Sequence, residues 1–341
     1  MELPKSYKQA AFKGLGEPLS IEEVELKLPG VGEVLVKVEA CGVCHSEVFS
    51  QYNVFGGGFP RVPGHELIGR VVAIGSDVAG WKVGDRIGGG YHGGHDGVCN
   101  ACIMGLPQMC EPYIVNGVTR DGGYAEYCIL LAKAGVRIPD EVDAAMYAPM
   151  LCAGVTVFNA IRSASLQPGD TVAVQGLGGL GHLAVQIAKK MGYRVVAISR
   201  GPEKEKAAEE LGANEYIDSS AGDAGAALRD LGYAKLVVTT AMATDAIAPL
   251  IKGVGIFGKL AILSVPENGE ITVNSNEMMM RGISVQSWPV GNCYDSEKVI
   301  NFALLQGVEC AIETFPLERA QEAFEKMLSG KVRFRAVLTM G

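Results

Sequence analysis

The chain has 341 residues, which is enough for one large or two medium-sized domains with a buried core. Its formal net charge of −8 argues against nucleic acid or an anionic membrane as a partner. Its content of 48% hydrophobic and 20% charged residues excludes a disordered chain. The 45 glycines follow no three-residue period, which excludes a collagen-like chain and indicates many tight turns.

The nine cysteines are clustered rather than paired along the chain, and the chain is too long for a disulfide-stapled mini-protein. The first residues contain no apolar signal segment, so we expect a reducing, cytoplasmic compartment, in which cysteine clusters usually bind metal. Residues 144–161 carry no charge, but they include Pro149, Gly154 and Asn159, which favours a buried helix with a broken start over a membrane span.

The first 140 residues are β-rich. Runs of β-branched and aromatic residues, separated by Gly and Pro clusters, predict strands at residues 34–38, 67–74 and 124–130. Such a pattern is expected of a compact, barrel-like domain.

After about residue 153 the predicted strands alternate with helices. The strands are at residues 171–175, 194–198, 216–217, 236–239 and 259–263, with helices at 180–191 and 203–211. This alternation predicts a parallel sheet covered on both faces. Amphipathic helices at 295–305 and 317–328 precede a closing strand at 334–338, which fits either domain.

The first strand of the alternating region runs directly into a glycine motif, Gly176-Leu177-Gly178-Gly179-Leu180-Gly181, and then into a helix. With a second strand about 20 residues on, this matches the dinucleotide-binding fingerprint. Gly176 permits the tight turn, Gly178 lets the backbone approach a pyrophosphate, and Gly181 allows close helix–strand packing. A plain strand-to-helix turn is the alternative interpretation.

The choice of dinucleotide is made at the end of the second strand. An acidic residue there would hold the adenosine ribose, whereas this chain has Ser199 and Arg200, with Lys204 close behind. A hydroxyl and two cations suit a 2′-phosphate, so NADP is favoured over NAD. The alternative is that Arg200 and Lys204 are only solvated surface charges.

A first set of candidate metal ligands comprises Asp96, Cys99, Cys102 and Cys110. Three thiolates and a carboxylate in one glycine-bounded loop suit a closed, tetrahedral structural zinc site. The alternatives are a free, reduced cysteine cluster, or a partly filled site with Asp96 too weak a ligand.

A second set comprises Cys44, His65 and Cys152. Two thiolates and one imidazole leave a fourth position open, which a catalytic zinc requires. Each residue alone has a more ordinary interpretation, as a buried thiol or a histidine bonded to backbone, and only the combination carries weight.

With these motifs in place, the sequence resembles the zinc-dependent medium-chain alcohol dehydrogenases, most closely their microbial and cinnamyl-alcohol-dehydrogenase-like branch. The match runs from the strand at Val34 through Gly64-His65-Glu66, residues 122–127, 152–156 and 176–181, to Arg335. The resemblance implies an α/β chain with a GroES-like β-barrel catalytic domain (residues 1–153 and 291–341) and a Rossmann doubly wound parallel sheet domain (residues 154–290). The cofactor is expected between them.

The resemblance also implies roles for residues around the second set. It places Cys44, His65 and Cys152 on the catalytic zinc, with Glu66 beside it as an alternate ligand. Ser46 matches the hydroxyl that begins proton transfer from the substrate alcohol. The resemblance further implies cofactor contacts, with His45 and Arg335 at the pyrophosphate. The remaining cofactor positions are Thr156, Ser264, Val265, Ser287 and Val290.

Three residues depart from the family pattern. Asp96 stands where the family commonly has a cysteine, which puts the affinity of the structural zinc site in doubt. The acid that orients the zinc-binding histidine is usually aspartate, and here it is Glu47. The relay histidine is replaced by Phe49, so proton release must pass from Ser46 through the nicotinamide ribose to water, or through His45.

The activity implied is hydride transfer between NAD(P)(H) and an alcohol/aldehyde pair, with a primary, aromatic or aliphatic substrate. The alternatives are a zinc-free quinone or enoyl reductase of the same superfamily and a non-catalytic, nucleotide-sensing zinc protein. We expect a homo-oligomer, either a dimer or a tetramer. Residues near motif positions are candidate substrate-pocket walls, with ordinary core packing as the alternative: Tyr52, Phe55, His92 and Trp288.

Overall fold

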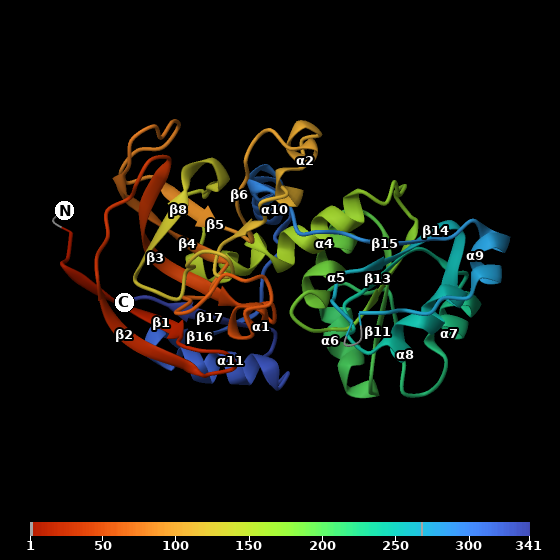
Figure 1. The fold of residues 1–341 in the computed structure, drawn as a ribbon. Coiled ribbons are helices and arrows are strands. Elements are labelled where there is room, and N and C mark those ends of the chain that lie inside the picture. Colours follow the sequence, from red (N-terminus) through yellow and green to blue (C-terminus); the bar gives the residue numbers. More distant parts are fainter. Residues whose placement is uncertain (1–2, 267–268) are drawn as a thin grey trace. The chain divides into compact units, whose positions relative to one another are not determined.

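The computed structural model describes residues 3–266 and 269–341, which divide into two compact units (Figure 1). Unit 1 comprises residues 3–155, 290–302 and 309–341, and unit 2 comprises residues 156–266, 269–289 and 303–308. Residues 303–308 were predicted in the first domain and group with unit 2, whereas residues 154, 155 and 290 were predicted in the second domain and group with unit 1. The helix α10 (Cys293–Gln306) runs continuously across this boundary, so its amphipathic pattern could not indicate where one unit ends and the other begins.

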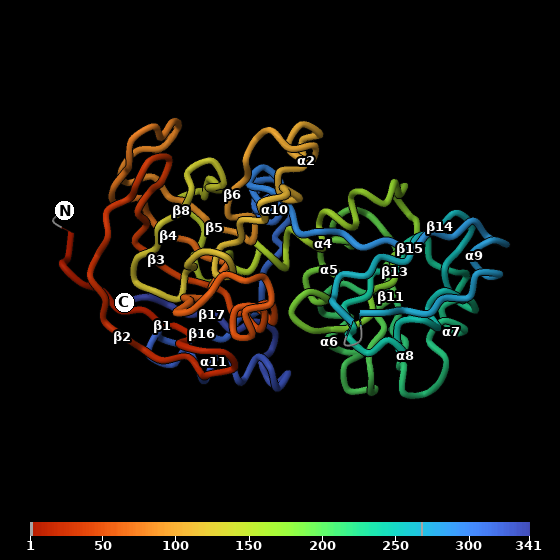
Figure 2. The backbone as a smooth tube through the Cα atoms, viewed as in Figure 1, coloured from red at the N-terminus to blue at the C-terminus, as the bar shows by residue number. Residues whose placement is uncertain are grey.

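Unit 1 is built on a seven-stranded sheet, mostly antiparallel, with strand order β16-β17-β3-β4-β5-β9 and with β8 also paired to β3. Its strands are β3 (Glu33–Val43), β4 (Leu67–Ile74), β5 (Arg86–Gly89), β8 (Tyr127–Leu131), β9 (Val136–Arg137), β16 (Ile312–Pro316) and β17 (Arg335–Thr339). The closing strand of the sequence analysis is β17, which pairs with β3 and therefore belongs to this unit, blue beside red-orange in Figure 2.

Two small sheets flank this one. They pair β1 (Ser6–Phe12) with β2 (Leu19–Glu25), and β6 (His92–Gly94) with β7 (Ile114–Val115). Besides α10, the α-helices of this unit are the short α1 (Glu47–Gln51), α2 (Asn100–Ile103) and α3 (Ala144–Tyr147) and the longer α11 (Ala320–Leu328). The apolar face of α11 buries Ala320, Ala323 and Phe324 in the core of unit 1, where Phe324 meets Phe12 edge to face.

Unit 2 contains a six-stranded parallel sheet with strand order β12-β11-β10-β13-β14-β15. The strands are β10 (Thr171–Gln175), β11 (Arg194–Ser199), β12 (Glu215–Asp218), β13 (Ala234–Thr239), β14 (Val254–Ile262) and β15 (Ser284–Ser287). In chain order this is 3-2-1-4-5-6, the doubly wound order of dinucleotide-binding domains. The helices are α4 (Ala153–Arg162), α5 (Gly181–Lys190), α6 (Glu205–Glu210), α7 (Ala224–Asp230), α8 (Thr244–Ile247) and α9 (Ser275–Arg281).

The uncharged segment forms two helical pieces with a break at Cys152. Residues Ala144–Leu151 and Ala153–Arg162 meet at 51°, and most of their residues are buried. Within residues 3–266 and 269–341, no single helix is long and apolar enough to cross a membrane, and only this bent pair passes that test jointly. The broken start places Cys152 outside helical geometry, at φ −133° and ψ −72°.

Candidate metal centres and nucleotide site

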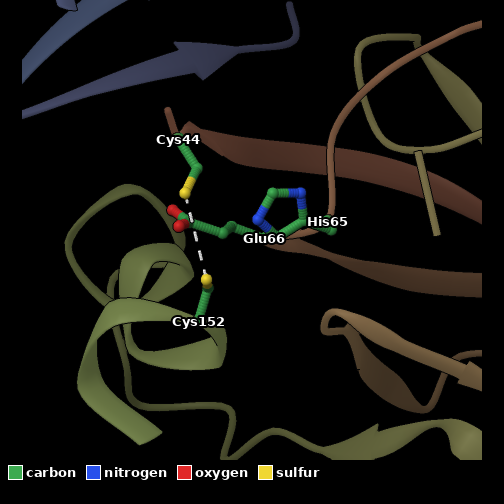
Figure 3. Close-up of side chains that lie close together, drawn as sticks. All are labelled: Cys44, His65, Glu66 and Cys152. Carbon is green, nitrogen blue, oxygen red and sulfur yellow. Dashed lines mark hydrogen bonds between the residues drawn. The ribbon is translucent and has the colours of Figure 1, made fainter. Parts of the chain in front are cut away.

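Four side chains with metal-binding atoms gather in unit 1. Cys44 follows the end of β3, and His65 and Glu66 directly precede β4. Cys152 comes from the break before α4. All four are buried, and their ligand atoms lie within 4.8 Å of one another (Figure 3). The three predicted ligands of the catalytic metal, and Glu66 beside them, are therefore brought together.

The donor atoms of this cluster fit a zinc ion. The sulfurs of Cys44 and Cys152 are 4.0 Å apart, close to the separation of about 3.8 Å that two zinc–sulfur bonds of about 2.3 Å give in a tetrahedron. His65 Nε2 is buried and has no hydrogen-bond partner within the described residues. The pKa of the Cys44 thiol lies well below its usual value, because of hydrogen bonding with Cys152 and the nearby positive charge of His65. A thiolate is the form that binds metal.

Glu66 is held by a buried cation. Both of its carboxylate oxygens accept hydrogen bonds from Nη2 of Arg335, at 2.5 and 2.6 Å. Burial raises the pKa of Glu66 to about 7, although Arg335 opposes the shift. A Cβ at Gly42 would overlap the Glu66 carboxylate, so glycine at that position makes room for it. The guanidinium of Arg335, predicted as a pyrophosphate contact, thus pairs with Glu66 in this structure.

The residues after Cys44 differ in exposure. Ser46 is half-buried, and its Oγ lies 3.6 Å from the sulfur of Cys44, within hydrogen-bonding reach for sulfur. His45 is exposed. Phe49, at the position of the relay histidine, packs edge to face against Phe55 with ring centroids 5.3 Å apart. The relay position is therefore part of an aromatic contact.

The second predicted ligand set also comes together. The ligand atoms of Asp96, Cys99, Cys102 and Cys110 lie within 4.8 Å of one another. Asp96 Oδ1 accepts the backbone N–H groups of Cys99, at 3.0 Å, and Val98, at 2.8 Å. These hydrogen bonds hold the pKa of Asp96 well below its usual value. Three sulfurs and an ionised carboxylate make a donor set that fits zinc.

The glycine motif forms the turn between β10 and α5 in unit 2. Gly176 has φ +92°, a left-handed conformation that favours glycine. A Cβ on Gly181 would overlap the carbonyl oxygen of Gly176, so the helix can start this close to the strand only with glycine there. Gly178 has open space at its Cβ position. Gly179 and Leu180 complete the turn, and α5 begins at Gly181.

The predicted 2′-phosphate residues lie at the end of β11. Ser199 is buried, and its Oγ accepts a hydrogen bond from the ammonium of Lys204 at 3.4 Å. Arg200 is exposed. Asp218, at the end of the neighbouring strand β12, accepts hydrogen bonds from the backbone N–H groups of Gly201 and Ser220. The carboxylate of Asp218, the acidic residue at this edge of the sheet, is therefore already hydrogen-bonded to the backbone of the chain.

The remaining predicted cofactor positions are spread over several elements. Ser287 ends β15, and Ser264 and Val265 follow β14 at the same sheet edge, since these parallel strands pair with Ile262 opposite Ser287. The Ser264 hydroxyl donates to the carbonyl of Ala241, and Val265 is 63% exposed. Two further predicted positions are Thr156, buried in α4, and Val290, which falls in unit 1.

The four predicted pocket residues come from different elements, and their role stays a prediction. Tyr52 and Phe55 are exposed residues at and after the end of α1. His92 is buried in β6, where its ring stacks on His95. Trp288 belongs to unit 2, and its buried Nε1 has no hydrogen-bond partner within the described residues.

Sequence comparisons identify the family. Residues 30–140 match the family described as "Alcohol dehydrogenase GroES-like domain", and residues 179–304 match "Zinc-binding dehydrogenase". The alcohol dehydrogenase notN of an Aspergillus species is 60% identical over 340 residues, which is 100% of each chain. The chain belongs to the zinc-type medium-chain alcohol dehydrogenase family.

Solved structures of this family share the whole fold. A cinnamyl alcohol dehydrogenase of Sorghum bicolor is 29% identical, with a TM-score of 0.88 over 98% of each chain. An acetophenone reductase of Geotrichum candidum, solved in complex with NAD, is 27% identical, with a TM-score of 0.85 over 99% of this chain and 98% of that chain. The predicted α/β fold with GroES-like and Rossmann domains is thus confirmed, as is the prediction of a dehydrogenase enzyme.

Two tyrosines beside the first metal cluster were missed from the sequence. Tyr91 meets the His65 ring edge to face, with centroids 5.1 Å apart. Its hydroxyl lies 3.1 Å from the hydroxyl of Tyr113. Burial and this hydrogen bond raise the pKa of Tyr91, so the phenol stays protonated at neutral pH. The sequence offered one indication that Tyr91 lies near the site, its position directly before His92, which was predicted to line the pocket.

Proposed function

We propose that this alcohol dehydrogenase is a zinc-dependent enzyme that transfers a hydride between NADP(H) and a primary alcohol/aldehyde pair. The observation that carries the proposal is the buried cluster of Cys44, His65 and Cys152, with an unpartnered imidazole nitrogen and a thiol of lowered pKa. The alternatives lack such support. A zinc-free reductase has no use for this donor set, and a nucleotide sensor has no use for three ligands that leave the fourth zinc position open.

The residues that would hold the catalytic zinc are Cys44, His65 and Cys152, with Glu66 within reach as an alternate ligand. When bound, zinc supplies Lewis-acid polarisation of the substrate oxygen and lowers the pKa of an alcohol near neutrality. Burial keeps water away from the three donor groups and strengthens their charges.

The proton of the substrate alcohol is assigned to Ser46. Its hydroxyl is half-buried and lies next to Cys44, so it is the first side-chain hydroxyl beside the metal cluster. Phe49 provides no proton acceptor, and His45 is exposed to solvent. We therefore propose that the proton leaves from Ser46 by way of the cofactor ribose to water, or through His45.

The preference for NADP over NAD rests on the end of β11. Ser199 and the ammonium of Lys204 are already in contact there, and Arg200 adds an exposed cation. These three groups provide the hydroxyl and positive charges that suit a 2′-phosphate. The open space at Gly178 and the start of α5 suit the pyrophosphate, because a helix N-terminus presents free N–H groups to an anion.

We also propose that Asp96, Cys99, Cys102 and Cys110 hold a second, structural zinc, and that the protein is a homo-oligomer, a dimer or a tetramer. Light scattering on the purified protein measures the oligomeric state.

The function is tested with purified protein by two measurements. Elemental analysis gives the zinc content, for which we expect two ions per chain. A panel of primary alcohols and aldehydes, assayed with both nucleotides, gives kcat/KM, which we expect to be higher with NADPH than with NADH. Absence of zinc, or absence of nucleotide oxidation with every aldehyde, would overturn the proposal. An equal or higher kcat/KM with NADH would overturn its cofactor part alone.

A further inference from the structure

His182 is a fully buried histidine that belongs to neither metal centre. It lies in the first turn of α5, directly after the glycine motif. Its Nδ1 atom is 3.0 Å from the carbonyl oxygen of Gly178. Because a carbonyl oxygen can only accept hydrogen bonds, Nδ1 carries the proton and donates it. A buried imidazole nitrogen costs free energy unless it is hydrogen-bonded, so this bond commits the side chain to the glycine motif.

The carbonyl oxygen of Gly178 accepts a second hydrogen bond from the same residue. The backbone N–H of His182 donates to it at 3.1 Å, as expected at the start of a helix. A carbonyl oxygen has two lone pairs, and His182 occupies both of them. The peptide group between Gly178 and Gly179 is therefore held with its oxygen toward α5 by two donors rather than one.

The fixed carbonyl also fixes the N–H on the other side of the same peptide group. In a planar trans peptide the C=O and N–H bonds point in opposite directions, so the Gly179 N–H points away from α5. Within the described residues this N–H makes no hydrogen bond, and neither do those of Leu177, Gly178, Leu180 and Gly181. Successive free N–H groups at the turn into a helix form a concave site for an anion.

On its strand side, the glycine motif is held by the main chain. The N–H of Gly176 donates to the carbonyl of Ile198 in β11 at 2.9 Å. In the part of the chain that the structure describes, no side chain except that of His182 hydrogen-bonds to residues 176–181. A substitution of His182 can therefore loosen the helix side of the turn while the strand side stays in place.

We propose that His182 is a positioning residue for the dinucleotide. By holding the Gly178 carbonyl, its imidazole keeps the Gly179 N–H directed at the phosphate group that lies on the glycine motif. A donor that is fixed before the phosphate arrives binds it more tightly than one that must be ordered on binding. This inference rests on the nucleotide part of the proposed function and adds to it a buried side chain that acts through a peptide group.

The test replaces the imidazole by side chains that separate its volume from its Nδ1–H donor. His182→Phe keeps a ring and has no donor. His182→Asn is smaller but places an amide N–H where Nδ1 lies, whereas His182→Gln places its amide where Nε2 lies. A purely structural role ranks the variants by how well they fill the buried site, with His182→Phe ahead of His182→Asn. The proposed role ranks them by the donor, in the opposite order.

The probes are two pairs of adenosine compounds that differ only in the 5′-phosphate. They are adenosine 2′,5′-bisphosphate with adenosine 2′-phosphate, and adenosine 5′-phosphate with adenosine, each titrated into the metal-replete protein by ligand-detected NMR. In each pair the ratio of the two dissociation constants measures the contribution of the 5′-phosphate. We expect this ratio to fall about threefold to tenfold in His182→Phe and His182→Gln, a partial loss of one charge-assisted hydrogen bond. In His182→Asn it should stay within about twofold of the wild type.

The matched control is Leu183→Ala, which truncates the next side chain along α5. Leu183 is fully buried, so this variant loses stability through a cavity, as His182→Asn does. It leaves the Gly178 carbonyl untouched and is expected to keep the wild-type ratio. All titrations are made at a temperature at which every variant is folded. Thermal unfolding of the same samples shows whether the ratio follows the donor or the stability.

Ratios that are equal in the wild type, His182→Phe and His182→Gln would overturn the inference, as would a ratio that falls with the thermal midpoint in Leu183→Ala or His182→Asn. Either result leaves the proposed function in place. A wild type in which the 5′-phosphate adds no affinity in either pair would overturn the nucleotide part of the proposed function and this inference with it. If only the 2′-phosphate adds no affinity, the preference for NADP fails, and adenosine 5′-phosphate with adenosine still decides the role of His182.

Discussion

The Nδ1 atom of His65 lies 3.1 Å from Oε1 of Glu47, and both side chains are fully buried. The other carboxylate oxygen of Glu47 accepts the backbone N–H of Gly64 at 3.1 Å. Because the Glu47 carboxylate lies beside Nδ1 as its ion-pair partner, Nε2 is the imidazole nitrogen on the side left for the metal cluster. Glu47 is therefore in contact with the predicted zinc ligand, although its side chain is one methylene longer than the aspartate expected from the family resemblance.

The variant Glu47→Gln is expected to weaken zinc binding at this cluster about 10- to 100-fold, because a neutral amide orients and polarises the imidazole less well. Competition with a chromophoric chelator measures the affinity. Glu47→Asp keeps the charge and is expected to retain most of the affinity. An affinity in Glu47→Gln equal to that of the wild type would contradict the orienting role of Glu47.

The variant Ser46→Ala is expected to lower kcat about 100-fold, because it removes the hydroxyl that we propose takes up the substrate proton. Ser46→Thr keeps a hydroxyl and should recover most of the rate. Steady-state kinetics at saturating nucleotide, together with the zinc content of each variant, separate proton transfer from metal loss. If Ser46→Ala has the same kcat and the same pH dependence of kcat as the wild type, the proton of the substrate alcohol does not pass through Ser46.

The double variant Arg200→Gln/Lys204→Gln is expected to raise the KM for NADPH at least tenfold, since charge-assisted hydrogen bonds to a phosphate contribute about 1.5–3 kcal/mol each. The KM for NADH should change less than about twofold, because NADH has no 2′-phosphate. Lys206→Gln, an exposed residue of α6, is the matched control. An equal rise in KM for NADPH and NADH would show that Arg200 and Lys204 do not bind the 2′-phosphate.

The parallel sheet of unit 2 was predictable because its inner strands β10, β11 and β13 are buried on both faces and are therefore continuous apolar runs. The strand predicted at residues 171–175 coincides with β10. By contrast, β14 starts at Val254, five residues before its predicted start. Its first part contains Phe257 at φ +50° and a register shift against β13, features that its residue types do not indicate.

One strand in unit 1 was predicted to start too early. Residues 124–130 were expected to form a strand, whereas β8 starts at Tyr127. Tyr124 is fully buried and donates its N–H to the carbonyl of Pro63, in a loop next to the metal cluster. Residues 124–126 pair with β1 only through an isolated bridge, Ala125 with Gln9, so the continuous ladder with β3 begins at Tyr127.

The metal clusters were predictable because few residue types bind zinc, and their spacing along the chain is informative. The Tyr91–Tyr113 pair was not, since the two residues are 22 positions apart and meet through a left-handed backbone at Tyr113. No propensity scale assigns that conformation to tyrosine. His92 was predicted to line the substrate pocket. In the structure it is buried and stacks on His95, which does not test that role, so the role stays a prediction.

His92 makes stability depend on pH. Burial, reinforced by the charges of His95 and Lys133, lowers the pKa of His92 to about 4. In an unfolded chain the pKa is near 6.5, so the unfolded state binds more protons between these values. The stabilising contribution of neutral, buried His92 to the free energy of unfolding is therefore complete above about pH 6.5, and it is lost as the pH falls toward 4.

Between pH 7.5 and 5.0 the wild type should lose about 2 kcal/mol of unfolding free energy more than His92→Gln. Urea denaturation at several pH values measures this difference. Parallel pH dependences in the two proteins would contradict a depressed pKa at His92.

Asp96 is expected to make the second cluster the more easily emptied of the two. Its carboxylate is a weaker zinc ligand than a thiolate, and the cluster is partly exposed, whereas Cys44, His65 and Cys152 are buried. Dialysis against a chelator should therefore remove zinc first from the second cluster. Asp96→Cys should slow this loss, and Asp96→Ala should reduce the zinc content from two ions to one and lower the thermal midpoint.

Asp96→Asn separates the two roles of the carboxylate. The amide oxygen can still accept the N–H groups of Val98 and Cys99, so the local turn is expected to persist while the charged ligand is lost. Asp96→Asn should then lose zinc as Asp96→Ala does, as measured by elemental analysis after dialysis. If Asp96→Asn and Asp96→Ala both keep two ions, Asp96 shapes the loop only, and the three cysteines alone hold the metal.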